Sequence, residues 1–191
     1  MLSLNLGNHY TKFQVDKEFQ NVSSLSSRHQ HQLGPTFQHG KSLEDCLFCK
    51  ISRGAVPETR MIWQDTSFVA FHDNKPASVT HILLIPKHHI LSIMDLTYKD
   101  LPLICAMKDI GSQILGDALQ IKQSRIKIGF HIPPYISETH LHLHLIGLPW
   151  KRFWKAKRYK DGTPRWVNID DLINTLRRKK ADGDVSAWSL P

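Results

Sequence analysis

The sequence predicts an α+β domain in which a five-stranded antiparallel sheet packs against one long helix, with a short helix at each end. Three observations support this fold class. The chain of 191 residues is long enough for one compact core and short for two. Several apolar runs have the length of strands and are separated by turn residues. One longer stretch places its apolar residues at helical spacing instead.

Three regions of different composition divide the chain. Residues 1–41 are rich in Ser, Gln, Asn and His without a sustained apolar period, which predicts a poorly ordered leader. The strand and helix patterns begin near residue 42, and we expect the folded domain over 42–150. Residues 151–191 form a basic C-terminal extension, in which a helix is expected near 168–180.

Signals for a helix and a hairpin begin the folded region. Ser42 is a suitable N-cap for a short helix over 43–52, and Gly54 follows as a stop. The runs 61–63 and 68–71 flank a turn of Asp, Thr and Ser. They therefore predict two antiparallel strands.

Strand and helix signals alternate in the rest of the domain. A third buried strand is expected over 81–85, where β-compatible residues end at a proline. Thr97 begins a capping-box pattern, and apolar residues at helical spacing follow over 101–118. Two further strands are expected over 126–130 and 139–146.

Positive charge is concentrated in one segment of the chain. The sequence has 25 Lys and Arg against 17 Asp and Glu, a formal net charge of +8. Eleven of these basic residues, but only three of the acidic ones, lie within 151–180. The segment is expected to attract nucleic acid or phosphorylated ligands, although a solvated surface run has the same composition. No apolar run approaches the roughly 18 residues of a membrane span, so no membrane partner is expected.

The N-terminal residues and the cysteines bear on the cellular compartment. The N-terminus lacks the apolar core of a secretory signal and the arginine content of a mitochondrial one, which favours a cytoplasmic or nuclear protein. Three cysteines do not make a disulfide framework. Cys46 and Cys49 have the spacing of half a metal site or are close by chance, and Cys105 fits the core side of the long helix.

The clearest chemical signal lies at 140–146, where the sequence is HLHLHLI. Alternate residues of a strand point to opposite faces, so His140, His142 and His144 are expected on one face and the leucines on the other. A neutral imidazole serves as nucleophile, general acid or hydrogen-bond donor, and phosphate chemistry uses all three roles. The alternatives are histidines that line a surface and a His-x-His metal pair.

This histidine row resembles the signature of the histidine-triad (HIT) nucleotide hydrolases and transferases. Three other segments occur in the order of that family, namely CLFCKI from Cys46, FHD from Phe71 and HILLIPKHH from His81. The stretch 128–134 and the following Ser137 resemble the branch with histidine triad nucleotide-binding protein 3 and the aprataxins. His131 stands where other branches usually have Asn. The resemblance implies the HIT-like fold and a two-fold homodimer built on the long helix and the central strand.

The resemblance also implies roles for individual residues. His142 attacks the α-phosphorus and carries the nucleotide until water hydrolyses the adduct. His144 donates to a non-bridging phosphate oxygen, Ser137 lies near the leaving group, and His140 completes the catalytic set. The expected nucleotide-binding residues are Phe48 and Ile51 at the base, Asp73 at the ribose hydroxyls, His131, and Asn74, where the family commonly has an apolar residue. Turn, cap or core roles are the alternatives for several of these positions.

The two cysteines acquire a role from the same resemblance. Cys46 and Cys49, together with His89 and His140, would form a closed tetrahedral site for structural zinc. Ordinary buried thiols are the alternative. Because a closed site leaves the metal no part in the attack on phosphorus, no catalytic metal is expected.

Three functional hypotheses follow from these expectations. The first is a hydrolase of nucleoside 5′-monophosphoramidates with an AMP-type purine nucleotide as ligand. The second is an aprataxin-like enzyme that removes AMP from adenylated DNA ends, which the basic segment favours. The third is a nucleotide-binding scaffold without catalysis, because a fold alone does not establish an activity.

Overall fold

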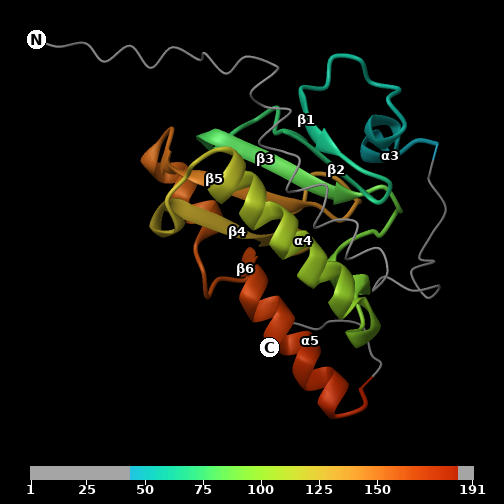
Figure 1. Cartoon of the computed structure of the whole chain (residues 1–191). Helices are drawn as coiled ribbons and strands as arrows, with labels where there is room; N and C mark the ends of the chain where they lie inside the picture. The colour runs from blue at the N-terminus through green and yellow to red at the C-terminus, as the bar shows by residue number, and fades with distance from the viewer. Residues whose placement is uncertain (1–43, 185–191) are drawn as a thin grey trace, which may run out of the picture.

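The computed structural model describes residues 44–184, which form a six-stranded sheet with helices on its two faces (Figure 1). Neighbouring strands are antiparallel, in the order β1-β2-β3-β5-β4-β6. The strands are β1 Met61–Gln64, β2 Phe68–His72, β3 Ser78–Pro86, β4 Ile126–His131, β5 Leu143–Trp150 and β6 Trp166–Asn168. The predicted α+β class is confirmed. The expected leader at 1–41 and the expected cap Ser42 lie outside the described residues.

Two helices cover one face of the sheet. α4 (Leu101–Gln113) lies across this face, and α5 (Ile169–Ala181) packs against it (Figure 1). The buried residues of both helices share a core with Leu143 and Leu145 of β5. The leucines of the histidine row therefore point to the α4 side, as the alternation predicts. Within residues 44–184, no helix has the length and apolar composition of a membrane span.

The start of the long helix agrees with the sequence pattern. The Asp100 carboxylate accepts a hydrogen bond from the backbone N–H of Thr97 at 2.8 Å, and the two residues form a capping box. The helical stretch expected to reach residue 118 ends in a different geometry, because Ile114–Ala118 is a π-turn.

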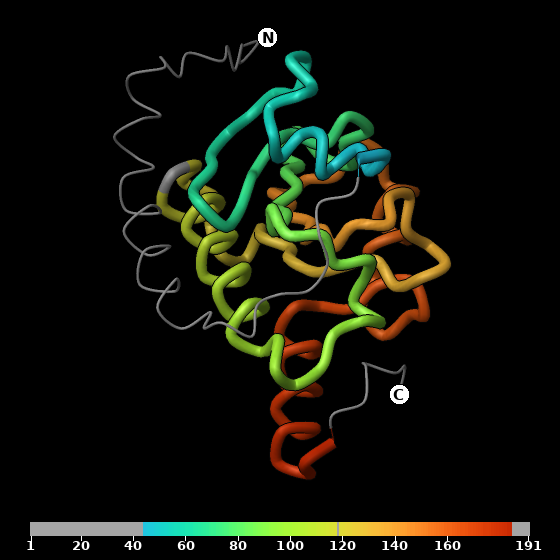
Figure 2. The backbone as a smooth tube through the Cα atoms, turned by 90° about the vertical axis from the view of Figure 1, so that its right-hand side faces the viewer, coloured from blue at the N-terminus to red at the C-terminus, as the bar shows by residue number. Residues whose placement is uncertain are grey.

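The opposite face of the sheet is covered at two separate places. At the first, α3 (Leu47–Ser52) packs Phe48 against β2 and β3. At the second, the 3-10 segment Phe153–Tyr159 packs its last residue, Tyr159, against Trp166. Figure 2 shows α3 near one end of the domain and α5 extending from the other. His144 of β5 and His142, which directly precedes this strand, lie between these two covers.

The sheet has one strand more than predicted. Residues 166–168 pair with β4 as strand β6, and Asn168 then caps α5, which begins at Ile169. Gly129 of β4 permits this close pairing, because a Cβ at that position would overlap the carbonyl oxygen of Val167. A strand of three residues is too short to show a period in the sequence, so its pattern merged with that of the following helix.

The strand expected over 139–146 begins later than predicted. β5 runs from Leu143 to Trp150, because its pairing with both β3 and β4 begins only near Leu143. The preceding residues lie outside the ladder, and the backbone N–H of Leu141 donates to the carbonyl of Ile90 at 2.6 Å. The first part of the histidine row is therefore free to turn away from the sheet.

Candidate active site

A cavity of about 750 Å³ lies on the face of the sheet opposite α4, between α3 and the end of the segment Phe153–Tyr159. Residues expected in the nucleotide site come together around it. They are Phe48, Ile51, Asp73, Asn74, His131, Ser137, His142 and His144. The fold thus gathers residues of α3, β4, β5, the β2–β3 connection and the β4–β5 loop.

His140 does not line this cavity. Its Nδ1 faces the sulfur atoms of Cys46 and Cys49, at 3.4 and 3.5 Å. Its ring turns toward α3, where it contacts Phe48. All three imidazoles lie on the side of the sheet that α3 covers, opposite the leucines, but only His142 and His144 line the cavity.

His142 has one ring nitrogen committed to the backbone. Its Nδ1 lies 2.6 Å from the carbonyl oxygen of His140, which only accepts, so Nδ1 carries the proton and Nε2 keeps its lone pair. Burial lowers the pKa of His142 against the raising effect of this hydrogen bond, so the ring is neutral near pH 7. A neutral imidazole with a free Nε2 is the form that acts as a nucleophile.

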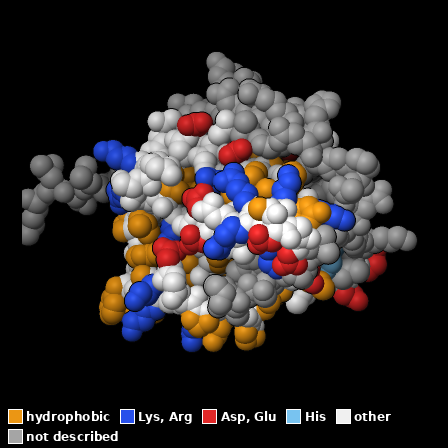
Figure 3. Space-filling view, turned by 90° about the horizontal axis from the view of Figure 1, so that it is seen from below, with side chains coloured by type: hydrophobic (Ala, Val, Ile, Leu, Met, Phe, Trp, Pro, Cys, Tyr) orange, Lys and Arg blue, Asp and Glu red, His pale blue; other side chains and the backbone are white. Residues whose placement is uncertain are grey.

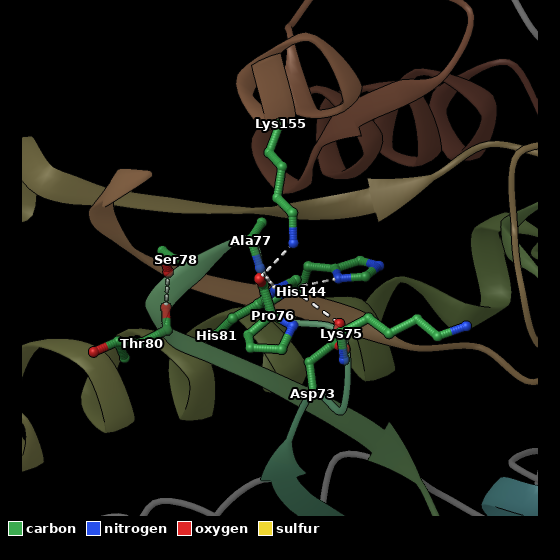
Figure 4. A network of polar contacts seen from close by, with 9 residues as sticks. All are labelled: Asp73, Lys75, Pro76, Ala77, Ser78, Thr80, His81, His144 and Lys155. Carbon is green, nitrogen blue, oxygen red and sulfur yellow. Dashed lines mark hydrogen bonds and ion pairs between the residues drawn. The ribbon is translucent and has the colours of Figure 1, made fainter. Parts of the chain in front are cut away.

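A chain of hydrogen bonds fixes His144 in the opposite tautomer (Figure 4). The backbone N–H of Ala77 donates to His81 Nδ1 at 2.9 Å, so the proton of His81 sits on Nε2. This atom lies 2.8 Å from His144 Nδ1, which therefore accepts. His144 carries its own proton on Nε2, a buried atom without a hydrogen-bond partner among the described residues. Because burial holds the pKa of His144 well below its ordinary value, the ring is a neutral donor.

His81, which lies close to Asp73, holds the His144 donor in place. Burial lowers the pKa of His81 to about 4, although the nearby Asp73 raises it. Asp73 Oδ2 lies 3.5 Å from His81 Nε2. Asp73, His81 and His144 are close enough to hold a cation, but the direct imidazole–imidazole hydrogen bond uses two of the nitrogens. The set is therefore a hydrogen-bonded chain, and only the HILLIPKHH segment hinted at His81 in the sequence.

The basic segment contacts the connection between β2 and β3. Lys155 Nζ donates to the carbonyl of Pro76 at 2.8 Å (Figure 4). Tyr159 is buried at the end of the segment, with its ring centroid 4.9 Å from that of His131. Arg158 and Tyr159 also line the cavity. The sequence interpretation missed both as site residues, because aromatic and basic residues interleave in many solvated segments.

Cys46, Cys49, His89 and His140 form a compact cluster beside the cavity. Cys49 Sγ lies 3.3 Å from His89 Nδ1, and Cys46 Sγ lies 3.4 Å from His140 Nδ1. A tetrahedral zinc ion, with Zn–S of about 2.3 Å and Zn–N of about 2.1 Å, separates sulfur and nitrogen by about 3.6 Å. The donor types and their spacing therefore fit zinc.

Neighbouring backbone groups prepare this cluster for a metal. His140 Nε2 lies 2.8 Å from the carbonyl oxygen of Pro86, so its proton sits there and Nδ1 keeps the lone pair that a metal needs. Burial lowers the pKa of His140 to about 4, which keeps the ring neutral.

The helix expected over 43–52 begins at Leu47, because Cys46 Sγ caps it by accepting from the Cys49 backbone N–H at 3.5 Å.

The fold and the site together define a class of protein. It is an α+β domain that places a neutral imidazole with a free Nε2 beside an imidazole donor on one face of an antiparallel sheet. A family model described as scavenger mRNA decapping enzyme C-term binding matches residues 45–160.

Named relatives agree with this class. Adenosine 5′-monophosphoramidase HINT3 of Danio rerio is 34% identical over 135 residues, which cover 71% of this chain and 84% of the relative. Bifunctional adenosine 5′-phosphosulfate phosphorylase/adenylylsulfatase HINT4 of Arabidopsis thaliana is 38% identical over 136 residues, 69% of this chain and 91% of the relative. A HIT family hydrolase from Legionella pneumophila Philadelphia 1 has 31% identity and a TM-score of 0.52, over 57% of this chain and 97% of that structure. The chain belongs to the histidine-triad (HIT) superfamily, which confirms the resemblance.

Proposed function

We propose that the protein is a HIT-family hydrolase of the adenosine 5′-monophosphoramidase type, which cleaves the P–N bond of nucleoside 5′-monophosphoramidates such as AMP–NH2 and AMP–lysine. The observation on which the proposal rests is the pair of opposite tautomers, with a free Nε2 on His142 and Nε2–H on His144. The two ring centroids are 5.0 Å apart, so one phosphate group can meet both. The names of the two relatives, which both refer to adenosine 5′-phosphate derivatives, support it.

The proposed reaction has two displacements at phosphorus. In the first, the lone pair of His142 Nε2 forms a bond to the α-phosphorus as the P–N bond breaks. The departing nitrogen takes that electron pair and one proton from solvent. In the second, water attacks the phosphorus, loses a proton to solvent and returns the electron pair to His142 Nε2. Throughout, His144 Nε2–H donates to a non-bridging oxygen and stabilises the charge that develops there.

The nucleoside is assigned to the α3 side of the cavity. Phe48 and Ile51 offer the base an apolar wall, and the Asp73 carboxylate is the acceptor for the ribose hydroxyls. The expected ligand is therefore a purine nucleotide of the AMP type. The remaining polar residues of the site are Asn74, His131 and, near the leaving group, Ser137.

The zinc proposed for the cysteine–histidine cluster has a structural role. When bound, the ion would crosslink Cys46 and Cys49 of the α3 region to His89 and His140 without an open coordination position. His140 acts on the reaction through its backbone, because its carbonyl accepts from His142 Nδ1 and so keeps Nε2 free. His140 is therefore a positioning residue, and no step of the reaction requires the metal.

Early-quench labelling tests the proposal. The protein is mixed with adenosine 5′-phosphoramidate labelled at the α-phosphate, quenched within the first turnover and digested to locate the label. We expect label on His142, and the chemical step of His142→Ala to be slower by about 10⁴-fold or more while AMP still binds. Unlabelled wild-type protein, together with loss of AMP binding in the variant, would mean that His142 contacts the ligand without forming a bond.

A second candidate function is the removal of AMP from adenylated DNA ends. An exposed aromatic and basic surface at 151–157 favours it, where Phe153 is 82% exposed and the Arg152 guanidinium lies 5.1 Å from the Trp154 ring. Such surfaces bind nucleic acid through charge and base stacking. On the face seen from below in Figure 3, basic and acidic side chains are mixed. Nucleic acid binding is proposed for the first part of the basic segment, where the exposed aromatic residues lie, whereas Lys179 in its last part is paired with Asp184.

Three further expectations stay predictions. A catalytically silent nucleotide scaffold is the remaining alternative, against which the free Nε2 of His142 argues. The homodimer through α4 and the central strand is carried over from the family resemblance. The cytoplasmic or nuclear location likewise stays a prediction.

A further inference from the structure

A second cavity, of about 230 Å³, adjoins the nucleotide site on the side away from α3. It shares His131, Tyr135, Ile136 and Arg158 with the larger cavity, and Pro134 and Arg165 complete its lining. We call this cavity the arginine pocket.

We propose that the arginine pocket binds the leaving group of the substrate and selects leaving groups that bear a carboxylate, sulfate or phosphate. The inference rests on the proposed chemistry of His142 and names its substrate class. These substrates are nucleoside 5′-phosphates joined through a P–N or P–O bond to a small acid.

The order of the strands places the pocket where a leaving group departs. Phe48 of α3 contacts the His142 ring, and the centroid of the His144 ring lies 5.0 Å from that of His142. The ring of His131, on the neighbouring strand β4, comes next, with its centroid 4.8 Å from that of His144. Arg165 directly precedes β6, the next strand across the sheet. Attacking and leaving atoms lie on opposite sides of the phosphorus in an in-line displacement. The arginine pocket is on the side of His142 away from Phe48 and α3, so we place the departing group there.

The charge of the pocket selects for anions. Its lining contains two arginines and no carboxylate among the described residues. The Arg165 guanidinium lies 4.6 Å from the Tyr135 ring centroid, a cation–π contact that restricts its motion. Burial is the main cause of the lowered pKa of His144, and the positive charge of Arg158 adds a small lowering, so Arg158 lies close enough to act on this ring. The guanidinium fork binds carboxylate, sulfate and phosphate through paired N–H donors.

Solvated surface arginines are the alternative, because Arg158 and Arg165 are both exposed. Their convergence on one cavity that is continuous with the nucleotide site argues for a binding role. Lys157, which is also exposed in the same segment, lines neither cavity. It therefore provides a control with the same charge, one residue from Arg158.

The bond changes are those of the proposed first displacement. The bond from His142 Nε2 to phosphorus forms as the bond to the leaving group breaks. A sulfate or phosphate departs with the electron pair as an anion, whereas an amine also takes one proton from solvent. The arginines exchange neither protons nor electrons and bind the anionic group before and after the displacement.

Two substrates that differ in one charge test the inference. The leaving group is 4-aminobutanoate in the first and 4-aminobutanamide in the second, so three methylene groups separate the charge from the same type of P–N bond. We expect kcat/KM at low ionic strength to favour the carboxylate by about tenfold, as one charge-assisted hydrogen bond provides. A wild-type ratio near one, with both substrates turned over and His142 labelled, overturns the inference and leaves the proposed function standing. Turnover of neither substrate overturns both.

Variants locate the preference. Arg158→Gln and Arg165→Gln are each expected to bring the carboxylate/amide ratio toward one, and Arg158→Lys to keep part of it. Lys157→Gln is expected to keep the wild-type ratio. The melting temperatures of all four variants show whether each one folds. An equal loss in Lys157→Gln assigns the preference to net charge and contradicts a specific pocket.

Two further substrates separate the sources of the anion. Faster turnover of adenosine 5′-phosphosulfate by wild-type protein than by Arg165→Gln supports the inference for sulfate. The second is a 5′-adenylated oligonucleotide. If its turnover is faster than that of the 4-aminobutanoate substrate and depends on Trp154 rather than on Arg165, the result contradicts a pocket for small acids. It would support nucleic acid as the partner.

Discussion

The two ends of the histidine row use the same side chain for different purposes. At one end, His140 lies against Cys46 and Cys49 in a closed cluster. At the other end, His144 lies against His81 in the wall of the open cavity. Both rings are buried, and burial lowers the pKa of both. They differ in the hydrogen bond that fixes each ring: His140 donates from Nε2 to a backbone carbonyl, whereas His144 accepts at Nδ1 from His81.

That partner atom sets the tautomer, and the tautomer sets the role that we propose. His140 gives Nε2–H to the carbonyl of Pro86 and keeps a free Nδ1 for a metal. His142 gives Nδ1–H to the carbonyl of His140 and keeps a free Nε2 for phosphorus. His144 accepts at Nδ1 and keeps Nε2–H for a phosphate oxygen. Residues of one type thus provide a ligand, a nucleophile and a donor.

Of changes at the two ends of the row, removal of the donor at the open end has the larger expected effect on catalysis. His144→Phe keeps the ring and loses Nε2–H, so we expect kcat to fall by about 10²–10³-fold while AMP binding changes little. His144→Gln, whose amide N–H can occupy a similar position, should retain more activity than His144→Phe. Equal losses in the two variants, measured by single-turnover kinetics, would assign His144 a packing role.

Removal of the metal from the closed end should affect stability more than chemistry. We expect about one zinc per chain by elemental analysis, and Cys49→Ser to lose it together with about 3 kcal/mol of unfolding free energy. Cys105→Ser is the matched control, because this cysteine lies on α4 outside the cluster. Equal metal content and equal urea midpoints in the two variants would contradict a zinc site in the cluster.

A pH dependence that His81 adds to stability is expected to be small over any one pH unit. A histidine in the unfolded chain titrates near 6.5, whereas the pKa of folded His81 is about 4. Between these values the unfolded state binds more protons, so the free energy of unfolding falls as the pH drops, by up to about 1.4 kcal/mol per pH unit.

His81→Gln isolates this contribution while its amide can still donate to His144 Nδ1. The urea-derived unfolding free energy of the variant should fall less steeply than that of wild-type protein over the same pH window. Parallel curves for the two proteins would mean that His81 is not neutral in the folded state.

The sequence predicts those parts of the fold that repeat a local pattern. Thr97 and Asp100 form the expected capping box, and the leucines of the row face the core. β6 was missed because its three residues pair through Gly129, a tertiary contact without a period. The alternation did not separate His140 from the two cavity histidines, because its ring meets Cys46 and Cys49 through tertiary contacts.

The residues that line the candidate site could be located from the sequence, but their proton positions could not. Residue types and the family resemblance place His142 and His144 in one pocket. Their tautomers depend on the carbonyl of His140 and, through His81, on the backbone N–H of Ala77. Backbone groups are the same at every position, so residue identity gives no sign of where the fold will aim them.

The most direct measurement is the proton position on each imidazole. Long-range ¹H–¹⁵N NMR spectra of histidine-labelled protein near pH 7, assigned with His142→Ala and His144→Phe, distinguish the two tautomers. We predict Nδ1–H with a bare Nε2 on His142, and Nε2–H with an accepting Nδ1 on His144. The same tautomer on both rings, or a charged imidazolium at either position, would contradict the division of roles on which the proposed mechanism depends.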